Sequence, residues 1–235
     1  MSICAKSFGK KRAIKEAVRA GEANVPMTEM HQHKLMLGKL RIDLRRLKMI
    51  KATDTKVELK RTQLLPEYAD YIAGVLEADV GQPDDVLLYN MVWQIDVGDY
   101  TKALQIGEYA IRHGLKMPER FQRDVPGLLA EYICNDLLKG DPESVAKATA
   151  ENAAMLQQLY DLVSAFDMHD AIKVKLLKAC GLAVKDTDPA IAVTFFKKVY
   201  AMDARSGVAT LIKQLDKQLL EMATAETVSA ESRSQ

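Results

Sequence analysis

The 235-residue sequence has little of what secreted, membrane-spanning or metal-stabilised proteins depend on. Its three cysteines, Cys4, Cys134 and Cys180, are odd in number and far apart. That arrangement fits neither a disulfide framework nor a zinc site, and it favours a reducing compartment such as the cytoplasm. No apolar run approaches the roughly 18 residues that a membrane-spanning helix needs. The basic N-terminus lacks the apolar centre of a secretory signal.

Motifs for nucleotide binding and nucleophilic catalysis are also missing from the sequence. It contains no G-x-x-x-x-G-K-[ST] phosphate loop and no G-x-S-x-G nucleophile elbow. His31 and His33, the only closely spaced histidines, would point to different faces of a helix, so we expect no shared metal ion. The sequence therefore predicts no catalytic residue, no metal site and no cofactor.

A metal-dependent nuclease is the enzymatic alternative, because such a site needs several carboxylates around one or two cations. Asp84, Asp85, Asp96 and Asp99 are the candidates. Asp84 and Asp85 follow Pro83, so we interpret them first as charges that stabilise the N-terminal end of a helix, worth about 0.3–1 kcal/mol each. Asp99 is interpreted as the cap of the following helix.

Charge is segregated along the chain, although the formal net charge is only +1. Residues 1–62 contain 16 Lys/Arg and 6 Asp/Glu, a net charge of +10. Residues 63–145 contain 6 Lys/Arg and 15 Asp/Glu, a net charge of −9, and residues 146–235 contain 11 of each. Folding does not need such segregation, so it points to the binding partners of the chain.

Clustered Lys and Arg in residues 1–62 predict an interface with nucleic acid, because such clusters release counterions from phosphates. The alternative is a basic face that packs against the acidic region. No helix-turn-helix signature is recognisable, so no residue is assigned to base reading. The predicted DNA-binding residues are Lys10, Lys11, Arg12, Lys15, Arg19, Lys39, Arg41, Arg45, Arg46, Lys48 and Lys51.

Helical periodicity predicts an all-α fold in four parts. Residues 1–27 are expected to form a basic flexible arm, and residues 28–62 a long amphipathic helix. Residues 63–222 are expected to form a core of helical hairpins with weak repeat character, in which Trp93 is buried. Residues 223–235 are polar and are predicted to be disordered. Within the core we expect a helix that Gly81 ends, and further helices over 86–97, 100–113, 128–138, 144–163, 170–184, 188–202 and 208–222.

An apolar stripe runs along the predicted long helix. Leu37, Leu40, Leu44 and Leu47 follow 3,4,3 spacing, which places them on one face. The stripe is shorter than the three to four heptads that indicate a coiled coil. It favours two interpretations equally: association with other copies of the chain, or packing against another helix of the same chain.

A specific order of residues lies in the middle of the chain: Leu64-Leu65-Pro66, Gly74-Val75-Leu76, Asp84-Asp85, Trp93, Asp96-x-Gly98-Asp99, Ala103-Leu104, and Tyr109-Ala110 through Gly114-Leu115 to Pro118. In this order the chain resembles the small terminase subunit of temperate, cohesive-end tailed phages. A Gly-Leu…Asp-x-x-Ala…Gly-Val pattern at 181–208 is similar too, so the resemblance spans about residues 28–220. Members of this family are sometimes labelled terminase, endonuclease subunit.

The resemblance implies a factor for viral genome packaging. Such subunits recognise the packaging site on double-stranded phage DNA, assemble as oligomers that are often rings, and recruit a large subunit with the ATPase and nuclease. It also implies the cytoplasm of the bacterial host. Two alternatives stay open: a subunit that itself contributes the endonuclease site, and a helical scaffold that binds only proteins.

Overall fold

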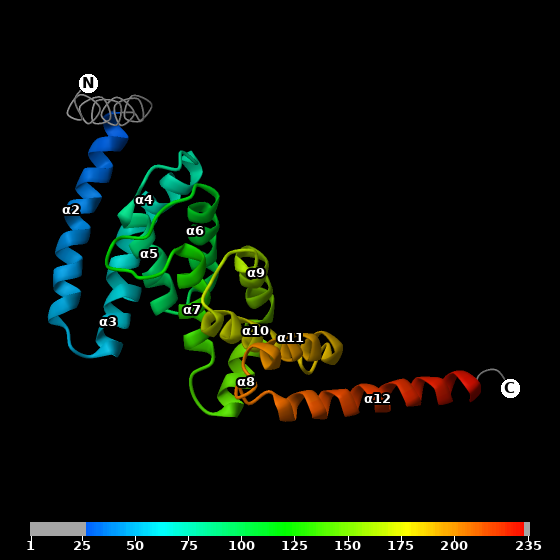
Figure 1. The fold of residues 1–235 in the computed structure, drawn as a ribbon. Coiled ribbons are helices and arrows are strands. Elements are labelled where there is room, and N and C mark those ends of the chain that lie inside the picture. Colours follow the sequence, from blue (N-terminus) through cyan, green and yellow to red (C-terminus); the bar gives the residue numbers. More distant parts are fainter. Residues whose placement is uncertain (1–26, 233–235) are drawn as a thin grey trace, which may run out of the picture. The chain divides into compact units, whose positions relative to one another are not determined.

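The computed structural model describes the backbone of residues 27–232 and the side chains of residues 32–224. Within this range all regular secondary structure is helical (Figure 1), which confirms the predicted all-α fold. The chain divides into two compact units, Met1–Leu59 and Lys60–Gln235. The helices are α2 (Met27–Met49), α3 (Thr53–Leu59), the π-helical η1 (Lys60–Leu64), α4 (Leu65–Ala78), α5 (Asp85–Asp96), α6 (Tyr100–Arg112), α7 (Val125–Leu137), α8 (Pro142–Glu151), α9 (Ala153–Val163), α10 (Asp170–Val184), α11 (Pro189–Met202) and α12 (Ala209–Ser232).

The prediction of one continuous helix over 28–62 is wrong. Helix α2 ends at Met49, residues 50–52 are not helical, and α3 begins at Thr53. The leucine stripe ends at Leu47, so a continued helix would have no apolar row to bury. Asp54 lies in the first turn of α3, where a carboxylate stabilises the positive helix end. The break therefore follows the end of the apolar pattern.

Helices α4 to α7 form the first part of the second unit. Helix α5 packs against both α4 and α6, and α6 packs against α7. Gly98 and Gly114 have φ of 80° and 64°, which confirms the predicted turn between α5 and α6 and the predicted end of α6. Trp93 is 3% exposed, and its ring lies 5.8 Å from that of Tyr68 in an edge-on arrangement. The only tryptophan is thus a core residue, as predicted.

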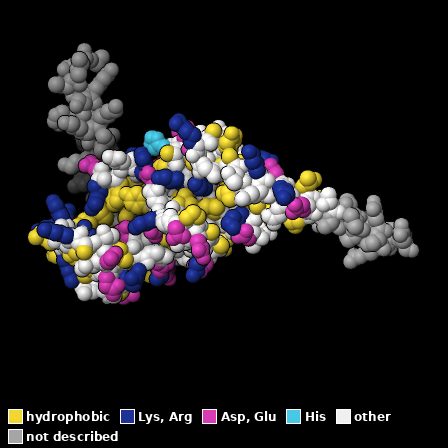
Figure 2. Space-filling model, turned by 90° about the horizontal axis from the view of Figure 1, so that it is seen from below, with side chains coloured by type: hydrophobic (Ala, Val, Ile, Leu, Met, Phe, Trp, Pro, Cys, Tyr) yellow, Lys and Arg dark blue, Asp and Glu magenta, His cyan; other side chains and the backbone are white. Residues whose placement is uncertain are grey.

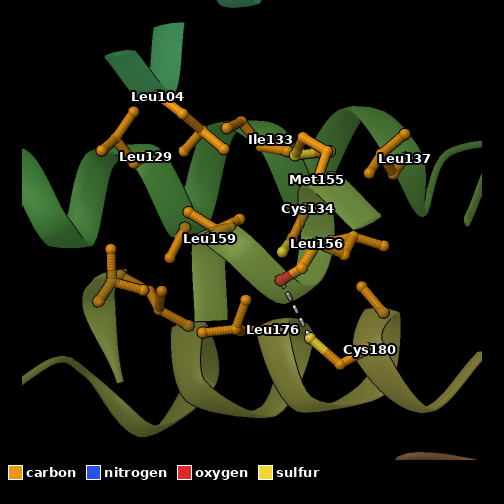
Figure 3. Packing of buried hydrophobic residues seen from close by; sticks show 14 of the residues in the cluster. Leu104, Leu129, Ile133, Cys134, Leu137, Met155, Leu156, Leu159, Leu176 and Cys180 are labelled. Atoms are coloured by element: carbon orange, nitrogen blue, oxygen red, sulfur yellow. Dashed lines mark hydrogen bonds between the residues drawn. The ribbon is translucent and has the colours of Figure 1, made fainter. Parts of the chain in front are cut away.

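Helices α7 to α12 complete this unit around a continuous hydrophobic core. Figure 3 shows side chains of α7, α9 and α10 meeting in its centre, among them Ile133, Leu156 and Leu176. The thiol of Cys180 lies 3.7 Å from the carbonyl oxygen of Leu156. Burial raises the pKa of the Cys180 thiol to about 12, so it stays protonated at neutral pH. This part of the chain is a packed core.

Two predictions for this region are wrong. The helix expected over 144–163 is divided at Asn152, whose side chain donates a hydrogen bond to the Ala148 carbonyl and closes α8. The tail was expected to be disordered from residue 223, but α12 continues to Ser232. No Gly or Pro interrupts α12, and Lys217 and Glu221 form an i,i+4 ion pair that favours a helix.

Between residues 27 and 232, no helix is both long enough and apolar enough to cross a membrane.

Candidate nucleic-acid interface

The basic residues that α2 contributes to the predicted interface lie in two rows. Arg41, Arg45 and Lys48 recur at i, i+4 and i+7, so they share one side of the helix, and all three are exposed. Lys39 and Arg46 are seven residues apart and form the second row. The structure therefore brings three of the predicted DNA-binding side chains together in one line.

The remaining predicted residues are placed differently. Lys51 is exposed and follows the end of α2. The Lys39 ammonium is 2.7 Å from the carboxylate of Asp43, which is buried, so part of its charge is compensated within the helix. The predicted residues of the arm, Lys10, Lys11, Arg12, Lys15 and Arg19, lie outside the described residues.

A second apolar row on α2 separates the two basic rows and was missed from the sequence. Leu35, Ile42 and Met49 are seven residues apart and are 73%, 59% and 82% exposed. Of the predicted leucine stripe, Leu40 and Leu47 are buried in the single chain, whereas Leu37 and Leu44 are half-buried. The heptad spacing of the exposed row can be read from the sequence. The sequence interpretation used the leucine stripe beside it, because that stripe contains more apolar residues. The role of the leucine stripe in oligomerisation stays a prediction.

Three of the four acidic residues considered for a nuclease site, Asp84, Asp96 and Asp99, make structural contacts. Asp84 is 5% exposed and caps α5, accepting hydrogen bonds from the backbone N–H groups of Val86 and Leu87. Its other oxygen accepts a 2.6 Å hydrogen bond from the Tyr71 hydroxyl. Burial, followed by the charge of Asp84, raises the pKa of Tyr71 well above its usual range. Asp85, one residue further, is exposed in the first turn of α5.

The other two candidates lie at the opposite end of α5, where Asp96 is the last helical residue and Asp99 follows it. Asp96 forms a 2.5 Å ion pair with Lys60 of η1. Asp99 caps α6 by accepting from the Lys102 backbone N–H, and it also forms a 2.8 Å ion pair with the Lys102 ammonium. A helix of 12 residues spans about 16–18 Å, so these carboxylates do not converge with Asp84. Across the described side chains, no group of three or more His, Cys, Asp or Glu is positioned to hold a metal ion.

The loop between α4 and α5 is held by the end of α6. Helix α4 ends at Ala78 and not at Gly81, because Asp79 takes a left-handed conformation with φ of 49°. One Asp79 oxygen contacts His113 Nε2 at 2.7 Å and accepts from Arg112 at 2.6 Å. The hydrogen bond with His113 lowers the pKa of Asp79 most, followed by the Arg112 contacts. Arg112 and His113 thus fix the loop between α4 and α5, although they lie more than 30 positions further along the chain.

A groove of about 640 Å³ lies on the second unit between η1, α4, α5 and α6. Asn90 and Gln94 of α5 contribute polar groups to it. Its charged lining residues are Arg61, Glu77, Asp99 and Lys102. On the face drawn in Figure 2, hydrophobic side chains reach the surface in several places between charges of both signs. The groove's apolar lining comes from Leu65, Pro66, Ala69, Ile72, Ala73, Leu76 and Ile106, among others.

Exposed basic rows, an exposed apolar row and an apolar groove on helices are features of proteins that bind other macromolecules. Residues 37–171 match the phage small terminase subunit family, and the chain belongs to this family. The match includes the α2 residues from Leu37 onward and the whole groove, and it confirms the resemblance noted in the sequence.

Two curated relatives are similar over most of the chain. The "Terminase, endonuclease subunit" of Escherichia phage P2 is 31% identical over 207 residues, which are 88% of this chain and 82% of that protein. The "Probable terminase, endonuclease subunit" of Haemophilus phage HP1 is 25% identical over 170 residues, 68% of this chain and 60% of that protein. No solved structure matches significantly.

Proposed function

We propose that this terminase subunit binds double-stranded phage DNA at the packaging site and recruits the large terminase subunit for genome packaging in the cytoplasm of the bacterial host. The observation that carries the DNA-binding part is the exposed row Arg41, Arg45 and Lys48 on α2. This row lies in a segment of net charge +10 and wholly within residues 37–171, the region that matches the family. Family membership supports the role in packaging.

The geometry of the row suits phosphates. From Arg41 to Lys48 the helix rises about 10 Å. Successive phosphates of one strand rise about 3.4 Å along the duplex axis, so the row spans about three phosphates. Such contacts position a protein on DNA without reading its sequence. The arm, residues 1–27, adds further Lys and Arg to the same segment.

Self-association is part of this proposal because each copy offers a small set of phosphate contacts. Several copies bound together raise the effective concentration of the remaining α2 helices once one is on the DNA. A specific site could then be selected by the spacing of several weak contacts. The large subunit, as the carrier of the motor and nuclease, would meet this assembly on DNA.

A truncation tests the DNA-binding part. We compare the full chain with residues 60–235, which form one compact unit, on double-stranded DNA of the phage at fixed salt. The shortened protein is expected to lose binding, while its Trp93 fluorescence stays that of the full chain and the helices of the second unit are retained. Equal affinity of the two proteins would show that residues 1–59 do not carry the interface.

The printed names of the relatives favour a second candidate, a subunit that contributes the endonuclease site. Purified protein incubated with phage DNA and Mg²⁺ or Mn²⁺ separates the two. We expect no cleavage. Cleavage that disappears in Asp96→Asn or Asp99→Asn, with folding intact, would establish the second candidate. Binding of the large subunit without any salt-dependent DNA affinity would instead support a scaffold that binds only proteins.

A further inference from the structure

The described part of the chain has two apolar surfaces that reach the solvent, a row on α2 and a groove on the second unit. We propose that the exposed row of one copy, Leu35, Ile42 and Met49 of α2, docks into the α4–α6 groove of a second copy. The inference rests on self-association as part of the proposed function and names the surfaces that carry it. It assigns the contact to a row that differs from the leucine stripe.

Pairing of the row with its equivalent on another α2 is disfavoured by the residues around it. In a coiled coil, the apolar positions alternate in steps of three and four. Three residues after Leu35 and Ile42 stand Gly38 and Arg45, and four residues after them stand Lys39 and Arg46. In either register a seam between two α2 helices would bring cations of both copies together, which is costly when they are buried.

The groove matches the row in length and character. Leu35 and Met49 are 14 residues apart, which is about 21 Å on a helix. The α4 wall runs from Leu65 to Glu77, about 18 Å, with small, exposed Ala69 and Ala73 along it. Small residues let a second helix approach closely, and an apolar face lying in such a groove is a common mode of helix recognition.

Charge on the α4 wall of the groove favours the basic helix as the occupant. The α4 wall carries Glu77, and the exposed Asp70 stands one turn before the groove-lining Ala73 and two turns before Glu77. The row formed by Lys39 and Arg46 would lie beside them. Two cations also line the groove: Lys102 forms a 2.8 Å ion pair with Asp99, and Arg61 donates a 3.2 Å hydrogen bond to the Val97 carbonyl. The row Arg41–Arg45–Lys48 on the other side of α2 keeps its access to phosphates.

A contact of this kind is heterologous, because different surfaces of the two copies meet. Each copy that joins still offers one α2 row and one groove, so the assembly grows until it closes on itself. Two surfaces that complement each other also allow a test by mixing, because damage to the row of one copy and the groove of another leaves one intact contact.

The experiment measures the mass of the full-length protein in solution. The row variant carries Leu35→Gln, Ile42→Gln and Met49→Gln, and the groove variant carries Ala69→Arg and Ala73→Arg. All five positions are exposed, so both variants are expected to fold. Each variant alone should be monomeric at concentrations at which wild type assembles. Their equimolar mixture should form a dimer, twice 26.2 kDa, and nothing larger.

Matched controls carry the same substitutions elsewhere on exposed positions. One replaces Met202, Leu220 and Met222 with glutamine, and the other replaces Ala78 and Ala154 with arginine. Both controls should assemble like wild type. Because charges contribute to the contact, the association constant of the wild type should fall at least tenfold as salt rises from 0.1 to 0.5 M.

Several results would overturn the inference. They are a monomeric wild type, a row variant that assembles like wild type, and a mixture that stays monomeric. A row variant that loses DNA binding but keeps its mass would assign this row to DNA. Because DNA affinity of the wild type is measured separately, failure of the docking contact is distinguishable from failure of DNA binding.

Discussion

Replacing Asp84 with alanine should destabilise the second unit far more than the charge at a helix end suggests. The carboxylate is buried, caps two backbone N–H groups of α5 and accepts the hydrogen bond of Tyr71. Loss of the cap costs about 1–2 kcal/mol. A buried Tyr71 hydroxyl without this acceptor costs about 1–3 kcal/mol more. The expected loss is about 2–5 kcal/mol, a large part of the total stability of a typical domain.

The neighbouring carboxylate provides the matched control. Asp85 is exposed in the same helical turn, so Asp85→Ala should cost only about 0.3–1 kcal/mol. In the double variant Tyr71→Phe with Asp84→Ala, no hydroxyl is left without its acceptor, so stability should recover by about 1 kcal/mol or more.

Urea unfolding followed by Trp93 fluorescence measures all four proteins, since this side chain is buried in the same unit. At about 2–4 °C per kcal/mol for a unit of this size, thermal unfolding of Asp84→Ala should fall by at least about 4 °C. If Asp84→Ala is no more destabilising than Asp85→Ala, Asp84 is not the structural cap described above and becomes a candidate for another role.

Two further predictions concern close packing and pH. A Cβ at Gly181 would lie 2.6 Å from the Phe196 ring, so Gly181→Ala should destabilise the folded state by about 1–3 kcal/mol. A Cβ at Gly74 would have no neighbour within 4 Å, so Gly74→Ala should stabilise the folded state by up to about 1 kcal/mol. The same unfolding assay measures both variants. The pKa of Asp79 is lowered from 3.8, so its carboxylate stabilises the folded state above that pH and ceases to do so as pH falls through the lowered value. The difference in Tm between wild type and Asp79→Asn should therefore shrink below pH 3.8, and a difference independent of pH would contradict the Asp79–His113 contact as its source.

The parts of the fold that could be predicted are those with local signals. The hairpin of α5 and α6 follows from a proline and aspartates at its start, a glycine at its turn and another at its end, each acting within a few residues. The buried position of Trp93 follows from the same pattern. Apolar residues lie around most of α5, and a helix that is apolar on most sides is buried in a core.

Other features depend on contacts that the sequence pattern does not contain. The α4 helix ends at Ala78, three residues before Gly81, because Arg112 and His113, far along the chain, hold Asp79. The sequence shows that α2 carries two apolar rows. Which of the two rows is buried depends on tertiary packing, which the sequence pattern does not contain. The groove likewise exists only once η1, α4, α5 and α6 are assembled. The DNA-binding role of the arm stays a prediction, since those residues are not described.

The salt dependence of DNA affinity tests the central claim most directly. The variant Arg41→Gln/Arg45→Gln/Lys48→Gln loses three phosphate contacts. Each loss should reduce the magnitude of the slope of log Kobs, the observed binding constant, against log salt by about 0.9, so the total reduction should be about 2–3. A control carries the same change at exposed positions of the second unit: Lys147, Lys198 and Lys213. We predict a reduced slope in the α2 variant and the wild-type slope in the control. A wild-type slope in both proteins would show that the basic row of α2 does not contact DNA.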